Sequence, residues 1–382
     1  MLLKLIVLTL TTNAFAAPKQ VSQTYEEAEA CNPALCKLPN CLCASTTPPG
    51  GLAPSQIPQF VVLTFDDAVN VGNIPYYREA FYNRKNPNNC PISTTYFVTH
   101  EYTDYSLVHE LWANGHEIAL HSITHQVPAD YWASLSVDGQ KREFIDQIDL
   151  MAKFAKIPPS SMKGIRLPFL QLSGNSSFQM IYESDLYYDS SWPTRSYIQS
   201  GLFPYTLDYR SPQDCALPPC PTASLPGVWV MPMVDWLDNS NVPCAMIDSC
   251  VDIPLDEDGL LLFMKNNFHR HYDGSRSPFG FYIHAAWFKK NENIYKAYKK
   301  FLDYLKEKDD VFLVTQQQVL EWMKNPKSLN DYNRLACPQK HSNSCTQPKS
   351  CRLMYGVQER YMTTCSDACP PAYPWLGNPL GV

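Results

Sequence analysis

The sequence predicts an α/β protein with one large domain and a cysteine-rich extension at each end. Between about Gln59 and Lys324, short apolar runs alternate with longer amphipathic runs, which is typical of a parallel sheet covered by helices. Eight of the short runs have the length and composition of strands, and eight strands are enough to close a barrel. Nine of the 14 cysteines lie outside this region, in ends with few aliphatic residues.

The expected strands are mainly apolar runs of three to seven residues. They are Phe60–Phe65, Thr94–Val98, Glu117–Leu120, Gly164–Leu167, Leu186–Tyr188, Val228–Val234, Phe279–Ile283 and Val311–Val314. The clearest helix is Glu292–Lys308, where Ile294, Tyr298, Phe301 and Leu305 recur at helical spacing between Lys and Glu. We expect this helix to cover the outside of the sheet.

The first 16 residues have the features of a secretory signal peptide: Lys4, a short apolar stretch, and Ala14 and Ala16 as a small-x-small cleavage site. No segment reaches the roughly 20 apolar residues that a membrane helix needs. We therefore expect a secreted protein without a membrane anchor. The predicted parts are a signal peptide (1–16), a Cys/Pro-rich arm (17–56), a catalytic domain (57–325) and a Cys-rich extension packed on it (326–382).

An even number of cysteines agrees with an oxidising compartment. The two ends of the chain together hold nine cysteines, an odd number, so at least one disulfide should join an end to the middle unless one cysteine stays free. The pairing itself cannot be read from the sequence. Zinc–cysteine sites are the competing interpretation, but no pair of CxxC repeats is present. The net charge of −6, or −7 without Lys4, and the lack of a long basic run do not favour nucleic acid as a partner. We expect a monomer.

Residues capable of chemistry gather where the expected strands end. In parallel α/β architectures, ligands bind at the carboxyl ends of the strands. The sequence therefore predicts one polar site at the carboxyl edge of the sheet, to which several strands contribute. The contributing residues are Asp66, Asp67, His121, Asp189 and His284, with Arg166 just inside the end of its strand.

Asp67, His121 and His125 are the predicted metal ligands, because three protein ligands leave a catalytic zinc one open position. The two imidazoles of HSITH are four residues apart and would face the same way on a helical turn. Neighbouring residues on an extended chain point to opposite sides, so Asp66 would stay free to take a proton. By itself, an HxxxH spacing more often belongs to surface or capping histidines than to metal ligands. The TFDD motif upstream makes the metal site the favoured interpretation.

Five motifs in this order resemble the polysaccharide deacetylases of carbohydrate esterase family four, and more narrowly the insect chitin deacetylases that lack a chitin-binding module. The resemblance covers about Gln59 to Lys324 and implies a distorted (β/α) barrel that hydrolyses the N-acetyl groups of N-acetylglucosamine units in chitin or its oligomers. The motifs are TFDDAVN (Thr64–Asn70), HSITH (His121–His125), RLPF (Arg166–Phe169), YDSSW (Tyr188–Trp192) and FYIHAAW (Phe281–Trp287).

The resemblance also implies roles for the site residues. Zinc, or another divalent transition metal, would activate water and the acetamide carbonyl. Asp66 would be the base, oriented by Arg166, and a backbone N–H near Phe169 would stabilise the oxyanion. Burial and the metal or Arg166 shift the pKa of Asp66 in opposite directions, and the sequence does not decide between them.

His284 is the expected acid for the leaving amine, and Asp189 would hold its imidazole, with Asp235 as the alternative. Trp192 and Ile283 would wall the pocket for the acetyl methyl. The less favoured alternatives are that Trp192 is a plain core residue and that Asp189 is only a turn or cap residue.

Two departures from the family pattern leave a second function open. Ala68 stands where many members have Gly, and Ser191 where many have Asp. A chitin-binding matrix protein with little turnover is therefore the alternative to an enzyme. A metal hydrolase for phosphate or peptide bonds is less favoured, because further metal ligands and an HExxH helix are absent. Asn175 begins a glycosylation sequon.

Overall fold

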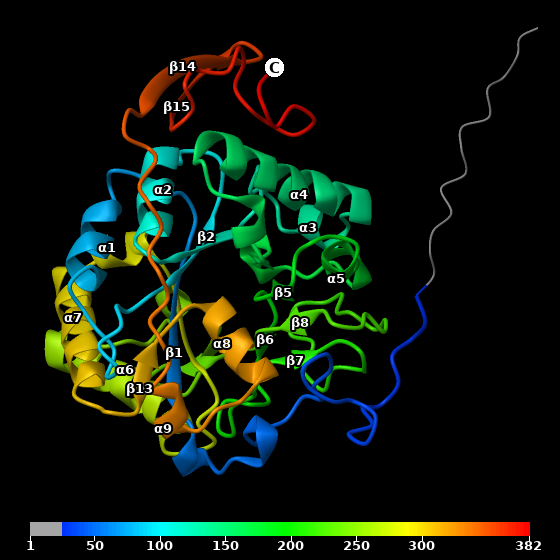
Figure 1. The fold of residues 1–382 in the computed structure, drawn as a ribbon, viewed down its shortest axis with the longest axis vertical. Coiled ribbons are helices and arrows are strands. Elements are labelled where there is room, and N and C mark those ends of the chain that lie inside the picture. The colour runs from blue at the N-terminus through cyan, green and yellow to red at the C-terminus, as the bar shows by residue number, and fades with distance from the viewer. Residues whose placement is uncertain (1–24) are drawn as a thin grey trace, which may run out of the picture.

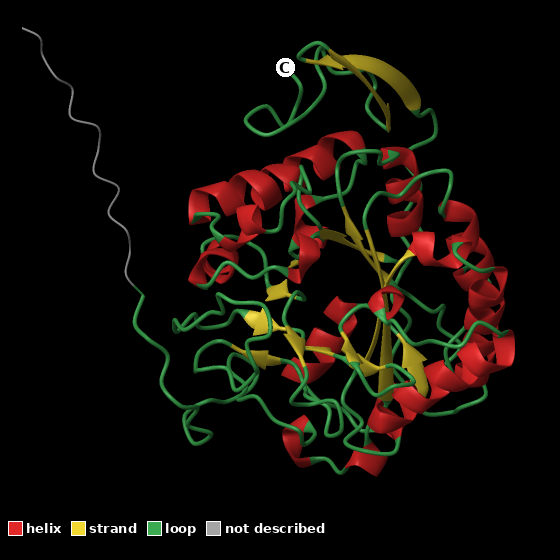
Figure 2. Ribbon diagram, turned by 180° about the vertical axis from the view of Figure 1, so that it is seen from behind, coloured by secondary structure: helices red, strands yellow, loops and turns green. Residues whose placement is uncertain are grey.

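The computed structural model describes residues 25–382, so the predicted signal peptide lies outside the described residues. A curled sheet of nine strands forms the centre of the molecule (Figures 1 and 2). Its order is β12-β1-β2-β3-β4-β5-β8-β7, and β13 also pairs with β1. The strands are β1 (Gln59–Asp66), β2 (Thr95–Val98), β3 (Glu117–Leu120), β4 (Gly164–Ile165), β5 (Tyr188–Asp189), β7 (Tyr205–Thr206), β8 (Trp229–Val230), β12 (Phe279–His284) and β13 (Val311–Leu313).

The α/β class is confirmed, and each of the eight predicted strands overlaps a strand of this sheet. The sheet is not a closed ring, however, because among residues 25–382 no strand pairing joins β7 to β12. Strand β7 was not predicted and runs antiparallel to β8. The predicted strand Val228–Val234 divides into β8 and β9 (Met233–Val234), and β9 pairs with β6 (Pro193–Thr194). The protein is thus a half-barrel.

Helices cover the convex side of the curled sheet, as Figure 2 shows. They are α1 (Ile74–Phe81), α2 (Tyr105–Ala113), α3 (Asp130–Ala133), α4 (Val137–Phe154), α5 (Asn175–Tyr182), α6 (Glu257–Tyr272) and α7 (Glu292–Lys306). Two further helices, α8 (Gln316–Lys324) and α9 (Leu329–Tyr332), pack against the inner core instead. Helix α7 confirms the predicted amphipathic helix and ends at Lys306. Of the helices between residues 25 and 382, none has both the length and the apolar composition to cross a membrane.

Strand β1 is buried on both sides, which explains its nearly continuous apolar sequence. Val61, Leu63 and Phe65 belong to the large core between the sheet and the outer helices. Phe60 and Val62 belong to a second core inside the half-barrel. Because side chains alternate along a strand, the inward row continues toward the carboxyl end of β1 with Thr64 and Asp66.

Helix α8 closes the opposite end of the half-barrel. Its residues Val319, Leu320 and Trp322 pack in the inner core with Phe60 and Phe312. Thr315 caps the helix, since its side chain accepts a hydrogen bond from the backbone N–H of Gln318. Apolar side chains therefore fill the half-barrel from the α8 end, and the polar groups lie toward the carboxyl ends of the strands.

The N-terminal arm packs beside β7. Two disulfides, Cys31–Cys43 and Cys36–Cys41, close it into short loops. The Thr206 N–H donates to the carbonyl of Leu42 at 3.0 Å. With these bonds the arm covers an edge of the sheet that would otherwise expose unpaired backbone groups.

The C-terminal extension forms a hairpin of β14 (Lys349–Tyr355) and β15 (Gln358–Thr364) above α2 and α4 (Figure 1). Cys345–Cys365 and Cys351–Cys369 staple the hairpin. Cys90–Cys337 joins the extension to the main domain, so the predicted bridge between an end and the middle is confirmed. The last two disulfides are Cys215–Cys220 and Cys244–Cys250, and no cysteine is free in the described part of the chain.

Buried His271 makes the stability of this fold depend on pH. Burial lowers its pKa to about 4, whereas an unfolded histidine titrates near 6.5. The folded state therefore binds fewer protons below pH 6.5, and stability is lost as the pH falls from 6.5 toward 4. We expect His271→Gln, which can keep the hydrogen bond to Ser277, to remove up to about 1.4 kcal/mol per pH unit of this loss. Urea unfolding of both proteins at pH 7 and pH 5 measures it; a pH-independent difference would contradict the assignment.

Candidate active site

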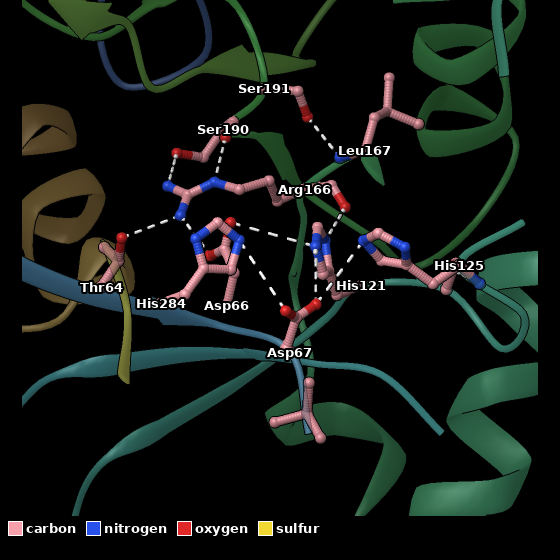
Figure 3. A network of polar contacts seen from close by, with 12 residues as sticks. Thr64, Asp66, Asp67, His121, His125, Arg166, Leu167, Ser190, Ser191 and His284 are labelled. Carbon is pink, nitrogen blue, oxygen red and sulfur yellow. Dashed lines mark hydrogen bonds and ion pairs between the residues drawn. The ribbon is translucent and has the colours of Figure 1, made fainter. Parts of the chain in front are cut away.

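The carboxyl ends of β1, β3 and β12 meet in one polar cleft (Figure 3). Asp66 and His284 are Cα partners at the ends of β1 and β12, and His121 directly follows β3. The cleft has a volume of about 500 Å³. Its walls come from the ends of β1 and β12 and from the loops that follow β1, β2, β3 and β12, and they include Asp66, Asp67, Ala68, Thr99, Glu101, Tyr102, His125, His284 and Lys289.

Asp67, His121 and His125 direct their donor atoms toward one another. Asp67 Oδ1 lies 3.9 Å from His121 Nε2 and 3.6 Å from His125 Nε2. These separations exceed the 2.7–3.2 Å of ordinary hydrogen bonds, and the three donor atoms lie within 4.8 Å of one another. Such spacing suits ligands around a shared ion at about 2.0–2.2 Å. The structure thus brings the predicted ligand set together.

The two histidines reach this position from a loop, so the prediction of a helical turn for HSITH is wrong. Ser122 has φ 75° and His125 has φ 46°, which no α-helix contains. Buried Glu143 on α4 holds the loop by accepting hydrogen bonds from Ile123 N–H at 3.1 Å and Thr124 N–H at 3.0 Å. Left-handed backbone at non-glycine residues costs energy and is often found at functional sites.

The hydrogen bonding of His121 leaves one ring nitrogen free for a ligand. Its Nδ1 lies 2.7 Å from the carbonyl oxygen of Arg166, which can only accept, so Nδ1 carries the proton. Burial is the main cause that lowers the pKa of His121, to about 4. The imidazole is therefore neutral, and Nε2 presents a lone pair toward Asp67. A backbone carbonyl on the second nitrogen is a common support for a metal-binding histidine.

Asp66 lies in the interior and pairs with buried Arg166. Nη1 of Arg166 donates to Asp66 Oδ1 at 2.6 Å and to Thr64 Oγ1 at 2.9 Å, while Nε and Nη2 donate to Ser190 at 2.7 and 3.0 Å. Burial, the largest influence, raises the pKa of Asp66, but Arg166, His121 and His284 together outweigh it, so the pKa is lowered. The direction that the sequence left open is thereby decided: Asp66 is a carboxylate.

His284 is held by Asp248, so the predicted partner Asp189 is wrong, and so is the alternative Asp235. His284 Nδ1 lies 2.8 Å from Asp248 Oδ2, and its Nε2 lies 3.9 Å from Asp67 Oδ2. Burial opposes the charge most strongly, but Asp248 and Asp66 overcome it and raise the pKa of His284 to about 9. The imidazole is protonated at neutral pH.

Asp248 lies in a short 3₁₀ turn, Ile247–Ser249, within the loop closed by Cys244–Cys250. This loop begins in the two-stranded sheet of β10 (Trp236–Leu237) and β11 (Pro243–Cys244). The sequence shows only that Asp248 lies between Cys244 and Cys250, and it does not show that these two cysteines pair.

Asp189 instead braces the turn after β5. Its carboxylate accepts from Ser191 N–H at 2.9 Å and from Ser191 Oγ at 2.6 Å. Ser191 Oγ in turn accepts from the N–H of Leu167 at 2.7 Å. Ser191, the departure from the family pattern, therefore links this turn to the segment that follows β4. Asp235, the alternative partner, pairs with Arg195: its Oδ2 lies 3.6 Å from Nε of Arg195.

Of the three predicted substrate-binding residues, only Phe169 contacts a residue of the cleft wall, His125. It is 44 % exposed, and its ring centre is 4.9 Å from that of His125. Ile283 pairs with Phe65 and lies in the helix-facing core, because His284 is the neighbour that points inward. Trp192 is also a core residue: it is 2 % exposed, and its Nε1 donates to the carbonyl of Asp214. Neither of these two side chains lines the cleft.

Comparisons with known proteins agree with this arrangement. The family model described as polysaccharide deacetylase matches residues 54–180. Chitin deacetylase 8 of Bombyx mori is 48% identical over 356 residues, which cover 92% of this chain and 93% of the relative. Chitin deacetylase 1 of Bombyx mori is 39% identical, with 92% and 68% covered.

Among solved structures, a putative polysaccharide deacetylase from Mycobacterium smegmatis matches with a TM-score of 0.50 at 16% identity, covering 77% of this chain and 97% of that one. This match concerns the fold alone. The two silk-moth relatives, which match nearly the whole chain, show that the protein belongs to the polysaccharide deacetylase family.

Proposed function

We propose that this protein is a secreted, zinc-dependent hydrolase that removes N-acetyl groups from the N-acetylglucosamine units of chitin or chitin oligomers and releases acetate. One observation carries the proposal: the three ligand side chains Asp67, His121 and His125 converge beside an ionised carboxylate, Asp66, and a protonated imidazole, His284. The names of the two Bombyx mori relatives support chitin as the substrate.

Asp67, His121 and His125 would hold the metal. Two imidazole nitrogens and one carboxylate oxygen suit Zn²⁺, and another divalent transition metal is also compatible with this set. When bound, the ion supplies Lewis acidity toward the acetamide carbonyl and lowers the pKa of water. The side chain of Asp67 is 47% exposed, so its carboxylate reaches the cleft while Asp66 stays inside.

Asp66 would accept the proton of the attacking water. Arg166 fixes the carboxylate through Oδ1, and Oδ2 faces His121 Nε2 at 4.0 Å, on the metal side. A lowered pKa makes a carboxylate a weak base by itself, so the water must be acidified for the transfer to proceed. Arg166 is here a positioning residue, because it contacts the base and not the substrate.

His284 would protonate the leaving amine. It already carries a proton at neutral pH, and its Nε2 faces the cleft while Asp248 holds Nδ1. Phe169 would contribute its backbone N–H to the oxyanion. Its φ of 60° turns the peptide at the edge of the site, and no acceptor among the described residues engages that N–H.

Secretion is supported by the seven disulfides, because such bonds persist in oxidising compartments. The signal peptide predicted for residues 1–16 would direct the chain into the secretory pathway. Glycosylation of Asn175 belongs to the same proposal; its Oδ1 accepts from the N–H groups of Thr222 and Ala223, which leaves its Nδ2 as the atom for attachment.

The proposal predicts metal-dependent acetate release. Purified protein should release acetate from chitin tetramers, lose that activity with a chelator and recover it with added Zn²⁺. Acetate assay together with elemental analysis measures both. Zinc-loaded protein that binds the oligomers but releases no acetate would overturn the enzyme proposal and support a chitin-binding role.

Adjacent aspartates should have separable effects. Asp66→Asn should lower kcat by about 10²- to 10⁴-fold, as expected for loss of a general base, and should keep zinc because Asp66 is not in the ligand set. Asp67→Asn should lose zinc as well as activity. Zinc content by elemental analysis distinguishes the two variants. Equal zinc loss in both would contradict the division of roles.

Asp248 should matter for turnover and less for substrate binding. Asp248→Asn removes the negative charge that orients His284 and raises its pKa. We therefore expect kcat to fall about 10- to 100-fold, with KM changed little. Asp252→Asn is the matched control on the neighbouring segment, because its carboxylate accepts from Ser240 Oγ and lies outside the cleft. Equal kcat values for the two variants would exclude a role for Asp248.

A further inference from the structure

We propose that Tyr102 is a stacking site for a sugar ring beside the one being deacetylated, and that the C-terminal extension holds the loop that carries it. Tyr102 lies in the loop 99–104 between β2 and α2, which forms one wall of the catalytic cleft. The inference rests on the proposed function, since it assigns a further subsite of the same substrate chain.

Tyr102 presents an unused aromatic ring to solvent at the cleft. It is 73% exposed and lines the cleft. Its φ of 65° is uncommon for a bulky residue. A strained, exposed aromatic at a cleft is more readily explained by a ligand than by the packing of the fold.

The backbone on both sides of Tyr102 is fixed by the C-terminal extension. His100 is 1% exposed; its Nε2 donates to the carbonyl of Pro374 at 2.9 Å, and its Nδ1 accepts from the hydroxyl of Tyr105 at 2.7 Å. The ring of His100 also packs on Tyr373, with centres 4.8 Å apart. One residue before the tyrosine, Glu101 pairs with Arg360 of β15 at 3.3 Å.

The other end of the loop is fixed as well. Asp104 forms a parallel bridge with Thr363 of β15. Its N–H donates to the carbonyl of Val69, in the loop that carries Asp67, at 2.8 Å. The side chain of Asp104 caps α2 by accepting from the N–H of Ser106 at 2.9 Å. The chain is thus anchored on both sides of Tyr102.

This arrangement suits the apolar face of a pyranose ring. A tyrosine ring offers a large flat apolar surface with only two side-chain torsions to restrict. Because the loop is ordered before binding, little further entropy is lost when a sugar stacks on it. Glu101 Oε2, which the Arg360 pair leaves free, supplies an acceptor for a sugar hydroxyl beside the ring. A chain of N-acetylhexosamines that reaches from the metal site to Tyr102 would use both.

Substrate length provides the test. For Tyr102→Ala, the ratio of kcat/KM on chitin hexamer to that on chitin dimer should fall about tenfold, through KM of the hexamer, while Tyr102→Trp should keep most of the ratio. Tyr182→Ala is the matched control, since Tyr182 is 45% exposed on α5 and lies outside the cleft. An unchanged ratio in Tyr102→Ala, or an equal fall in both alanine variants, would overturn the stacking site.

The role of the extension is tested by comparing single and double variants of Arg360 and Tyr102. Arg360→Ala should raise KM for the hexamer about threefold with kcat retained, and should add nothing further when combined with Tyr102→Ala, because it acts through the same ring. Additive effects on KM, or a fall in kcat alone, would show that Arg360 does not position Tyr102.

Failure of this inference can be told from failure of the proposed function. Hexamer affinity is also measured by calorimetry in an Asp66→Asn background, where turnover is blocked. Acetate release by the wild type with unchanged hexamer affinity in the Tyr102→Ala form would overturn only the subsite. Absence of acetate release with a tenfold loss of affinity would overturn the enzyme and leave the sugar site.

Discussion

The buried ion pair between Asp66 and Arg166 constrains the rest of the site. Two charges can remain in a protein interior only if their hydrogen-bonding groups are satisfied. Arg166 therefore donates to Thr64 and Asp66 on β1 and to Ser190 after β5, and its guanidinium stacks on Phe97 at 4.1 Å. The ends of several strands are thus fixed relative to one another by a single side chain. Without such bracing, strands of only two residues, such as β4 and β5, would define these positions poorly.

The same arginine connects Asp66 to His121 through its backbone. Its carbonyl accepts the Nδ1 proton of His121, and its N–H donates to the carbonyl of Leu120 at 3.0 Å. One residue therefore contributes both to the ionisation of Asp66 and to the tautomer of His121. This coupling explains how the neutral imidazole of His121 and the ionised carboxylate of Asp66 are maintained side by side, with 4.0 Å between His121 Nε2 and Asp66 Oδ2.

The sequence predicted correctly the positions of the residues that lie at the end of a strand. It did not predict contacts between residues on loops that are distant in the sequence. Asp66, His121 and His284 could be placed together because parallel strands end at the same edge. The partner of His284 could not, since Asp248 arrives from a disulfide loop outside the main sheet. Likewise, nothing local indicated that Glu143 on α4 would shape the HSITH segment into a loop.

The error at Ile283 could have been avoided by alternation along the strand. If His284 points into the cleft, its neighbour must point toward the helices, and Ile283 does so. Asp66 and Asp67 do not follow that simple rule, because Asp67 leaves the strand with φ 79°. This turn carries the second carboxylate out to the cleft, at 47% exposure, whereas the first stays inside at 3%. Two identical neighbouring residues thus acquire different surroundings from one backbone torsion: the carboxylate of Asp67 is half exposed, and that of Asp66 is buried and held by Arg166.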